Sequence, residues 1–277
     1  MFAGLVMVTV AAASWGTWSL FLRPLQLSPF VTAPLVFLIM GLCALPFALP
    51  GRRTWDRGAY GWLVANAIFD ALNLVLFFAA IDATTVAIAV LSHYVAPVLI
   101  ALAAPRLEGT RVPGTKGAAL VSLCGLLIVL EPWAEPVHGA IAGAAFGLGS
   151  AVCYAGNVFC LRNLSSRVGP QKAMAYHTLL SAALVAPLAL TGLGTVTPHA
   201  LGILAIGAAT IGAGSGIVFA IGLSRIGSAR AAVLTFAEPL VAVAIGALVW
   251  GEALHPLAAV GGVLILGAGV HVARQAR

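Results

Sequence analysis

Long runs of apolar residues, separated by short polar gaps, fill almost the whole chain. A helix of about 20 apolar residues is long enough to cross the hydrocarbon core of a bilayer. The pattern therefore predicts ten transmembrane helices, at residues 3–22, 29–49, 59–81, 84–104, 114–130, 139–161, 171–190, 199–221, 227–249 and 256–273.

The runs are continuous rather than alternating, which favours helices over the strands of a membrane barrel. Apolar residues make up 61% of the chain and charged residues 8%, whereas about a quarter of a soluble domain is charged. We therefore predict an all-α integral membrane protein. The gaps are too short for a soluble catalytic or nucleotide-binding domain, which excludes an ATP-driven pump in one chain. The four cysteines lie within the runs without metal-ligand spacing, and no metal or cofactor is expected.

The basic residues gather in alternate gaps, as they do when one side of the membrane holds them. With a cytoplasmic N-terminus, only Arg23 lies outside, and the inner side holds Arg52, Arg53, Arg57, Arg106, Arg111, Lys116, Arg162, Arg167, Lys172, Arg225, Arg230, Arg274 and Arg277. This is the distribution of the positive-inside rule. We expect both termini in the cytoplasm and the protein in the inner membrane of the cell. The net charge of +6 then reflects topology and not a nucleic-acid partner. The first run lacks a basic leader and is expected to be retained, not cleaved as a signal peptide.

The chain also repeats itself at an offset of roughly 140 residues. Four matches occur in one order: Trp15 and Arg23 with Tyr154 and Arg162, Leu45–Leu49 with Ala186–Leu190, Tyr94–Val98 with Phe236–Leu240, and Pro113 with Pro256. They predict two homologous five-helix halves, 1–133 and 134–277. Because five is an odd number, the second half must enter the membrane from the opposite side.

Inverted repeats of this kind are typical of secondary transporters, whose substrate site lies near the bilayer midplane between the repeats. The expected partners are the lipid bilayer and a small-molecule substrate. The mechanism expected is alternating access, in which the two halves exchange conformations. A proton gradient, exchange and the substrate's own gradient are all open as driving forces.

Two stretches resemble the drug/metabolite transporter superfamily, EamA-type. Ala79–Ala87 followed by Tyr94–Pro97 is similar to the signature of the family's third and fourth helices. Leu223–Pro239 followed by Gly251-Glu252 is similar to that of its eighth and ninth helices. The chain departs from this pattern in its first half, where Ala96 stands in the place of Glu238 and Leu107-Glu108-Gly109 in the place of Gly251-Glu252.

The resemblance covers essentially the whole chain. It implies ten helices in a 5+5 inverted arrangement around a central cavity, with the fifth and tenth helices more peripheral. It also implies transport, often export, of amino acids, amines or related metabolites. Substrate identity does not follow, because the family is chemically diverse.

One polar stripe crosses the apolar run 59–81. Asn66, Asp70 and Asn73 share a helix face, which Phe77 continues. A charge at the bilayer centre costs about 2.5–3.5 kcal/mol or more, so this face is expected to line a wet cavity. Asp70 would act there as a proton carrier or as the counter-ion of a cationic substrate. The alternative is that Asp70 only hydrogen-bonds a neighbouring helix.

Two further acid–base candidates lie beside prolines. Glu238 precedes Pro239, and His93 and Tyr94 lie close to Pro97. Proline frees a carbonyl one turn earlier and can bend a helix, so we predict hinges at Pro97 and Pro239. Glu238 binds substrate or a proton, or it only orients the bend. His93 titrates, or it only packs.

Aromatic residues complete the predicted site. Trp15, Tyr94, Tyr154 and Phe236 are expected to form aromatic walls, with Asn157 close to Tyr154. Such faces can hold an organic cation. Tyr176 and His177 are compatible with either packing or binding.

Other functional classes are weighed against transport. An aspartyl protease would need a second buried aspartate, but Asp70 is the only one within a run. Ser92 and His93 are adjacent on one helix and point in different directions, so a serine enzyme is not favoured either. We expect no enzyme activity. The alternatives are an intramembrane enzyme and a membrane scaffold that does not transport. The direction of flux, the coupling ion and the oligomeric state do not follow from the sequence.

Overall fold

The computed structural model describes residues 1–48, 55–109, 111–133, 139–190 and 192–275. Within these residues the regular structure is helical, which confirms the all-α class. The helices are α1 (Phe2–Trp15), α2 (Ser19–Leu22), η1 (Arg23–Leu25), α3 (Pro29–Ala48), α4 (Arg57–Ala83), α5 (Val86–His93), α6 (Ala96–Leu107), α7 (Thr115–Leu130), α8 (Ala140–Val168), α9 (Pro170–Ala189), η2 (Leu193–Thr195), α10 (Pro198–Gly207), the π-helical η3 (Ala208–Gly214), α11 (Ser215–Ile226), α12 (Ser228–Leu234), α13 (Ala237–Trp250) and α14 (Leu257–Arg274).

Eight helical segments of the described residues are long and apolar enough to cross a membrane: Phe2–Leu25, Pro29–Ala48, Arg57–Ala83, Val86–Leu107, Ala140–Val168, Pro198–Ile226, Ser228–Trp250 and Leu257–Arg274. Helices α7 and α9 occupy the two remaining predicted ranges. Helix α7 is only 16 residues long, and α9 carries polar residues such as His177 and Ser181 that lower its mean hydropathy. Eight spans establish a multi-pass membrane protein, and ten crossings remain a prediction.

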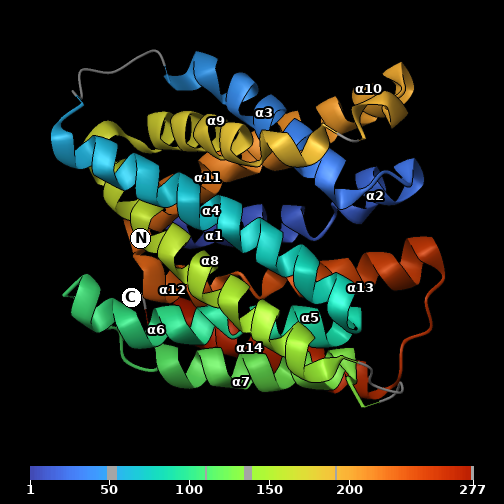
Figure 1. Ribbon diagram of the computed structural model, residues 1–277. Coiled ribbons are helices and arrows are strands. Elements are labelled where there is room, and N and C mark those ends of the chain that lie inside the picture. The colour runs from blue at the N-terminus through green and yellow to red at the C-terminus, as the bar shows by residue number, and fades with distance from the viewer. Residues whose placement is uncertain (49–54, 110, 134–138, 191, 276–277) are drawn as a thin grey trace.

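The helices pair across the two halves of the chain (Figure 1). The most extensive contacts are those of α4 with α8, α3 with α9, α7 with α14, and α1 with α11, while α6 packs mainly on α12. Each of these pairs joins one helix from before residue 133 to one from after residue 139. Helices α7 and α14 lie together at the edge of the bundle in Figure 1.

Two helices are interrupted just before their prolines. Helix α5 ends at His93 and α6 begins at Ala96, next to Pro97. In the same way α12 ends at Leu234 and α13 begins at Ala237, two residues before Pro239. Proline has no N–H to donate to the preceding turn. The breaks therefore fall where the sequence predicts bends, while their role as hinges stays a prediction.

An ion pair joins the elements at each end of the bundle. At one end, Arg162 Nη1 of α8 lies 2.9 Å from Glu108 Oε2 at the end of α6, and the Ser228 backbone N–H of α12 donates to the same oxygen. At the other end, Arg23 Nη1 lies 2.6 Å from Glu252 Oε1, with its guanidinium 5.0 Å from the Trp250 ring. The Glu108 side chain is 2% exposed, whereas Glu252 is 53% exposed.

The first of these ends is also sealed by apolar packing. One core cluster of the described residues brings Leu5 and Val8 of α1 against Leu164 of α8 and Leu223 and Ile226 of α11. Together with the Glu108–Arg162 pair, this cluster closes the end of the bundle at which α1 begins.

Candidate functional site

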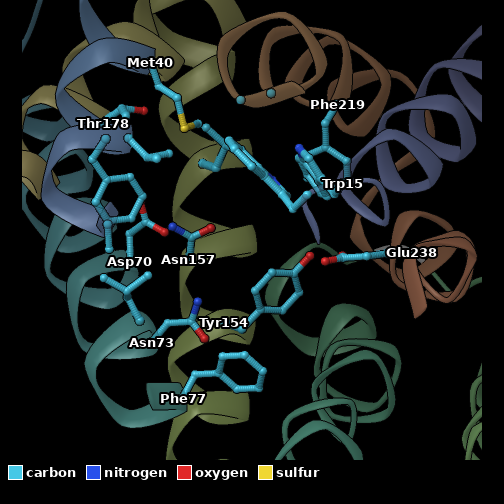
Figure 2. A pocket seen from close by; sticks show the side chains of 18 of the residues that line it. Trp15, Met40, Asp70, Asn73, Phe77, Tyr154, Asn157, Thr178, Phe219 and Glu238 are labelled. Carbon is cyan, nitrogen blue, oxygen red and sulfur yellow. The ribbon is translucent and has the colours of Figure 1, made fainter. Parts of the chain in front are cut away.

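A cavity of about 400 Å³ lies between the two halves of the chain (Figure 2). Its wall comes from α1–α5 on one side and from α8, α9, η3, α11 and α13 on the other. The predicted site residues on this wall are Trp15, Asp70, Asn73, Phe77, His93, Tyr94, Tyr154, Asn157 and Glu238. The structure thus gathers most of the predicted residues around one space.

Two side chains of α9 lie beside the carboxyl group of Asp70 on α4. The Ser181 hydroxyl donates to Asp70 Oδ2 over 3.2 Å, and His177 Nε2 lies 3.5 Å from the same oxygen. Figure 2 shows the Asp70 carboxyl and the Asn157 amide turned toward each other. Asn157 Nδ2 is buried and has no hydrogen-bond partner among the described residues. This side of the cavity therefore offers a carboxyl group and an amide donor to a bound molecule.

Glu238 forms a second acidic centre on a different helix. Figure 2 shows the Tyr154 hydroxyl pointing at its carboxyl group, and Tyr94 lines the same cavity. Glu238 lies in the first turn of α13, where the helix dipole favours a negative charge. The two carboxyl groups are thus held on opposite walls, each by groups of a different kind.

His93 is linked to the Asp70 helix through a serine. Its Nδ1 lies 2.8 Å from Ser150 Oγ, and Ser150 in turn donates to the Asn73 side-chain oxygen over 2.8 Å. Around the imidazole ring stand Phe77, Tyr94 and Tyr154, with ring centroids 4.9–5.4 Å away. The hydrogen bond to Ser150 holds one edge of the imidazole ring, and the three aromatic side chains pack around that ring.

Aromatic rings form much of the remaining wall. Trp15 packs on Phe219 with ring centroids 4.9 Å apart, and Trp18, Phe37 and Phe78 also face the cavity. Among the described lining residues there is no lysine or arginine. Rings attract cations through their negative faces. The wall therefore suits an apolar molecule that carries a positive charge.

Two of the predicted cavity residues lie behind the wall. Asn66 is fully buried between helices, and both of its amide atoms lack a partner among the described residues. It lies one turn before Asp70 on α4 and is not among the residues that line the cavity. Phe236 is also fully buried, and it packs on Tyr94 with ring centroids 5.6 Å apart. Both residues back the wall without lining it.

Several lining residues were not singled out from the sequence, and the internal repeat could have found some of them. Phe219 stands at the repeat position of Phe77, and both face the cavity. His177 stands at the repeat position of Val36, and both also line it. The ionisable lining residues of the first half are not repeated in the second half. Gly212 stands at the repeat position of Asp70, and Thr235 stands at that of His93.

Long apolar helices around an internal cavity with buried carboxyl groups define a multi-pass membrane protein of the transporter class. The family whose model matches is the EamA-like transporter family, at residues 2–130 and again at 141–273. The chain therefore belongs to the EamA-like transporter family, and it is a membrane transporter.

Individual relatives agree with this assignment. An "Uncharacterized transporter" of Archaeoglobus fulgidus is 32% identical over 269 residues, which cover 96% of this chain and 94% of the relative. The "Uncharacterized transporter YwfM" of Bacillus subtilis is 27% identical over 90% of this chain and 86% of its own length. A solved structure, titled only "Crystal structure of protein", matches with a TM-score of 0.83 over 99% of both chains at 22% identity. That likeness shows the fold alone.

Proposed function

We propose that the protein is a secondary transporter that exports small metabolites, such as amino acids or amines, by alternating access. The observation that carries this proposal is the cavity itself. It lies between the two halves of the chain and is lined by Asp70 and Glu238, which belong to segments that are long and apolar enough to cross a membrane. Carboxyl groups are rarely kept at that depth without a functional partner.

This mechanism depends on ten crossings arranged in two inverted halves, 1–133 and 134–277. The family model matches the chain twice, once in each half. The helix pairs agree with a twofold relation as well. Exchanging each helix of one half for its counterpart turns the α4–α8 contact into the α1–α11 contact and leaves the α3–α9 and α7–α14 contacts in place.

The positive-inside rule assigns the two ends of the bundle to the two sides of the membrane. The elements that carry basic residues meet at the end where α1 begins: Arg162 pairs with Glu108, Arg167 pairs with Asp56, and Arg225 lies next to Gly4. Of the basic residues predicted on this side, Arg52, Arg53 and Arg277 fall outside the described residues. We place this end in the cytoplasm. The cavity reaches toward the opposite end, at Leu22 and Thr32, so this is an outward-facing state.

The two terminal ion pairs are candidates for the gates. Arg23 and Arg162 occupy matching positions in the repeat, and their partners Glu252 and Glu108 follow the ends of the corresponding helices α13 and α6. The cytoplasmic pair is shielded from solvent and the outer pair is exposed. In an inverted repeat, exchange of the two conformations would bury the outer pair and expose the inner one.

A transport assay tests this function. Purified protein in proteoliposomes is given a panel of radiolabelled amino acids and amines, with and without a pH gradient. The wild type is expected to move at least one member of the panel, and protein-free liposomes none. No movement of any member in either direction would refute the proposal.

The variant Asp70→Asn is expected to abolish that transport, because an amide cannot carry the charge that binds a proton or a cation. Expression and thermal stability in detergent should stay close to those of the wild type, since the two side chains have nearly the same shape. An equal loss of folding would make Asp70 a structural residue.

A further inference from the structure

One histidine on the cavity wall has both ring nitrogens committed by its surroundings. His177 Nδ1 lies 2.8 Å from the Ala173 carbonyl oxygen, which can only accept, so Nδ1 carries a hydrogen. The other nitrogen, Nε2, lies 3.5 Å from Asp70 Oδ2. The His177 side chain is 4% exposed and the Asp70 side chain 17%.

This arrangement favours one additional proton. A neutral histidine with its hydrogen on Nδ1 has a lone pair on Nε2. That lone pair would face a carboxylate oxygen, and two acceptors facing each other in a buried place are unfavourable. A proton on Nε2 or on the Asp70 carboxyl group removes the conflict. Ser181 already donates to Oδ2 and has no second proton to give.

The other groups on the cavity wall do not supply this charge. The titratable residues that face the pair are His93 and Tyr94 from α5, Tyr154 from α8 and Glu238 from α13. The lining residues of α3, η3 and α11 contribute none, and none of the described lining residues is a lysine or arginine. When the proton leaves, no lysine or arginine among the described lining residues is present to neutralise the Asp70 carboxylate.

We propose that Asp70 and His177 together hold the proton that this transporter exchanges for a positively charged, amine-bearing substrate. The proposal rests on the transport function proposed above. When the ammonium group binds beside Asp70, the shared proton leaves for the water of the cavity, and His177 remains neutral with its hydrogen on Nδ1. One cation enters as one proton leaves, so the net charge of the site is unchanged.

Binding of phenethylammonium to the detergent-purified protein tests the exchange. Trp15 and Trp18 line the cavity, so tryptophan fluorescence reports binding, and a pH indicator in weak buffer reports proton release. We expect roughly one proton per bound amine, and a Kd that rises about tenfold for each unit of pH lowered while the pair is protonated. Binding without proton release would overturn the proposal.

Amino-acid substitutions test which residues hold the exchanged proton. Asp70→Asn should abolish both amine binding and proton release while the protein remains monodisperse. His177→Gln should still bind the amine, with a weaker dependence of Kd on pH and less proton released. Unchanged release from His177→Gln would remove His177 from the site. Loss of release from His93→Gln, with retention in His177→Gln, would assign the proton to His93 and also overturn the proposal. His199→Gln on the exposed start of α10 is the matched control and should behave as the wild type.

A transport assay distinguishes a failure of the proton exchange from a failure of the transport function on which it rests. If the proteoliposomes move phenethylammonium or another panel member without counter-movement of protons, proton exchange fails and the transport function stands. If no panel member moves at all, the transport function itself fails.

Discussion

At the residue scale, depth within an apolar run leads to Asp70 and Glu238, because the cost of a buried charge holds for any fold, and both residues line the cavity. It could not separate lining residues from those one turn behind them. Asn66 shares a face with Asp70, yet Asn66 is fully buried and only Asp70 lines the cavity. His177 was equally compatible with packing or binding, because its partner Asp70 lies on a different helix.

Replacing a ring of the cavity wall tests the cation preference. Trp15→Leu should weaken phenethylammonium binding by about 1 kcal/mol, or roughly fivefold, because a tryptophan face attracts a cation and leucine does not. Isothermal titration measures the change.

Trp133→Leu is the control for that variant, since Trp133 is exposed and lies outside the cavity. It should bind the amine as the wild type does. Equal affinities of the Trp15 and Trp133 variants would show that the ring does not contact the cation.

At the element scale, the helices follow the ranges that the apolar runs predict, and most ends differ by a few residues. Helix α8 differs more, because it continues past the predicted end at residue 161 to Val168. The end predicted at residue 49 lies outside the described residues. The runs carry no signal for the π-helical turn η3, which packs against α3. The breaks before Pro97 and Pro239 were predictable, because proline removes a helix hydrogen bond wherever it stands.

The contact between α7 and α14 depends on two facing glycines. A Cβ atom added to Gly125 would lie 2.7 Å from the Gly261 carbonyl oxygen. Gly125→Ala should therefore lower the free energy of unfolding by about 1–3 kcal/mol, because backbone atoms cannot move aside easily. Thermal unfolding in detergent measures this as a lower Tm.

Gly117→Ala on the same helix is the matched control. A Cβ atom there meets nothing within 4 Å, and alanine is the better helix former by about 0.5–1 kcal/mol. Its Tm should stay the same or rise. A Tm that is unchanged in Gly125→Ala would mean that the two helices are not in close contact.

At the scale of the whole molecule, the repeat matches in the sequence predicted which segments correspond, and the helix pairing is consistent with them. They could not predict which state is stable. The outward-facing state proposed above would depend on packing at the end where α1 begins, where Leu5, Leu164 and Leu223 meet beside the Glu108–Arg162 pair. Those contacts involve three distant parts of the chain.

Breaking the cytoplasmic pair should shift the protein toward the inward-facing state. Removing one partner of a buried ion pair costs about 3–5 kcal/mol, and 1.4 kcal/mol changes a population ratio about tenfold. In a variant whose four cysteines are alanine and which carries Leu22→Cys on the outer part of the cavity, Glu108→Gln should slow labelling by an impermeant maleimide about tenfold or more.

Glu131→Gln serves as the control for that experiment. Glu131 pairs with His255 away from the cavity, so its loss should leave the labelling rate of Leu22→Cys unchanged. Faster labelling in Glu108→Gln would mean that the pair does not hold the cytoplasmic end closed.

The difference between Asp70 and its repeat counterpart Gly212 has a consequence for how such a frame can arise. A symmetric pair of identical five-helix chains would have to carry every ionisable side chain in duplicate, so each acid of the cavity wall would appear twice. Two copies joined in one polypeptide can change independently of each other. The two halves can then keep similar helices while Asp70 lies only on α4 and Glu238 only on α13.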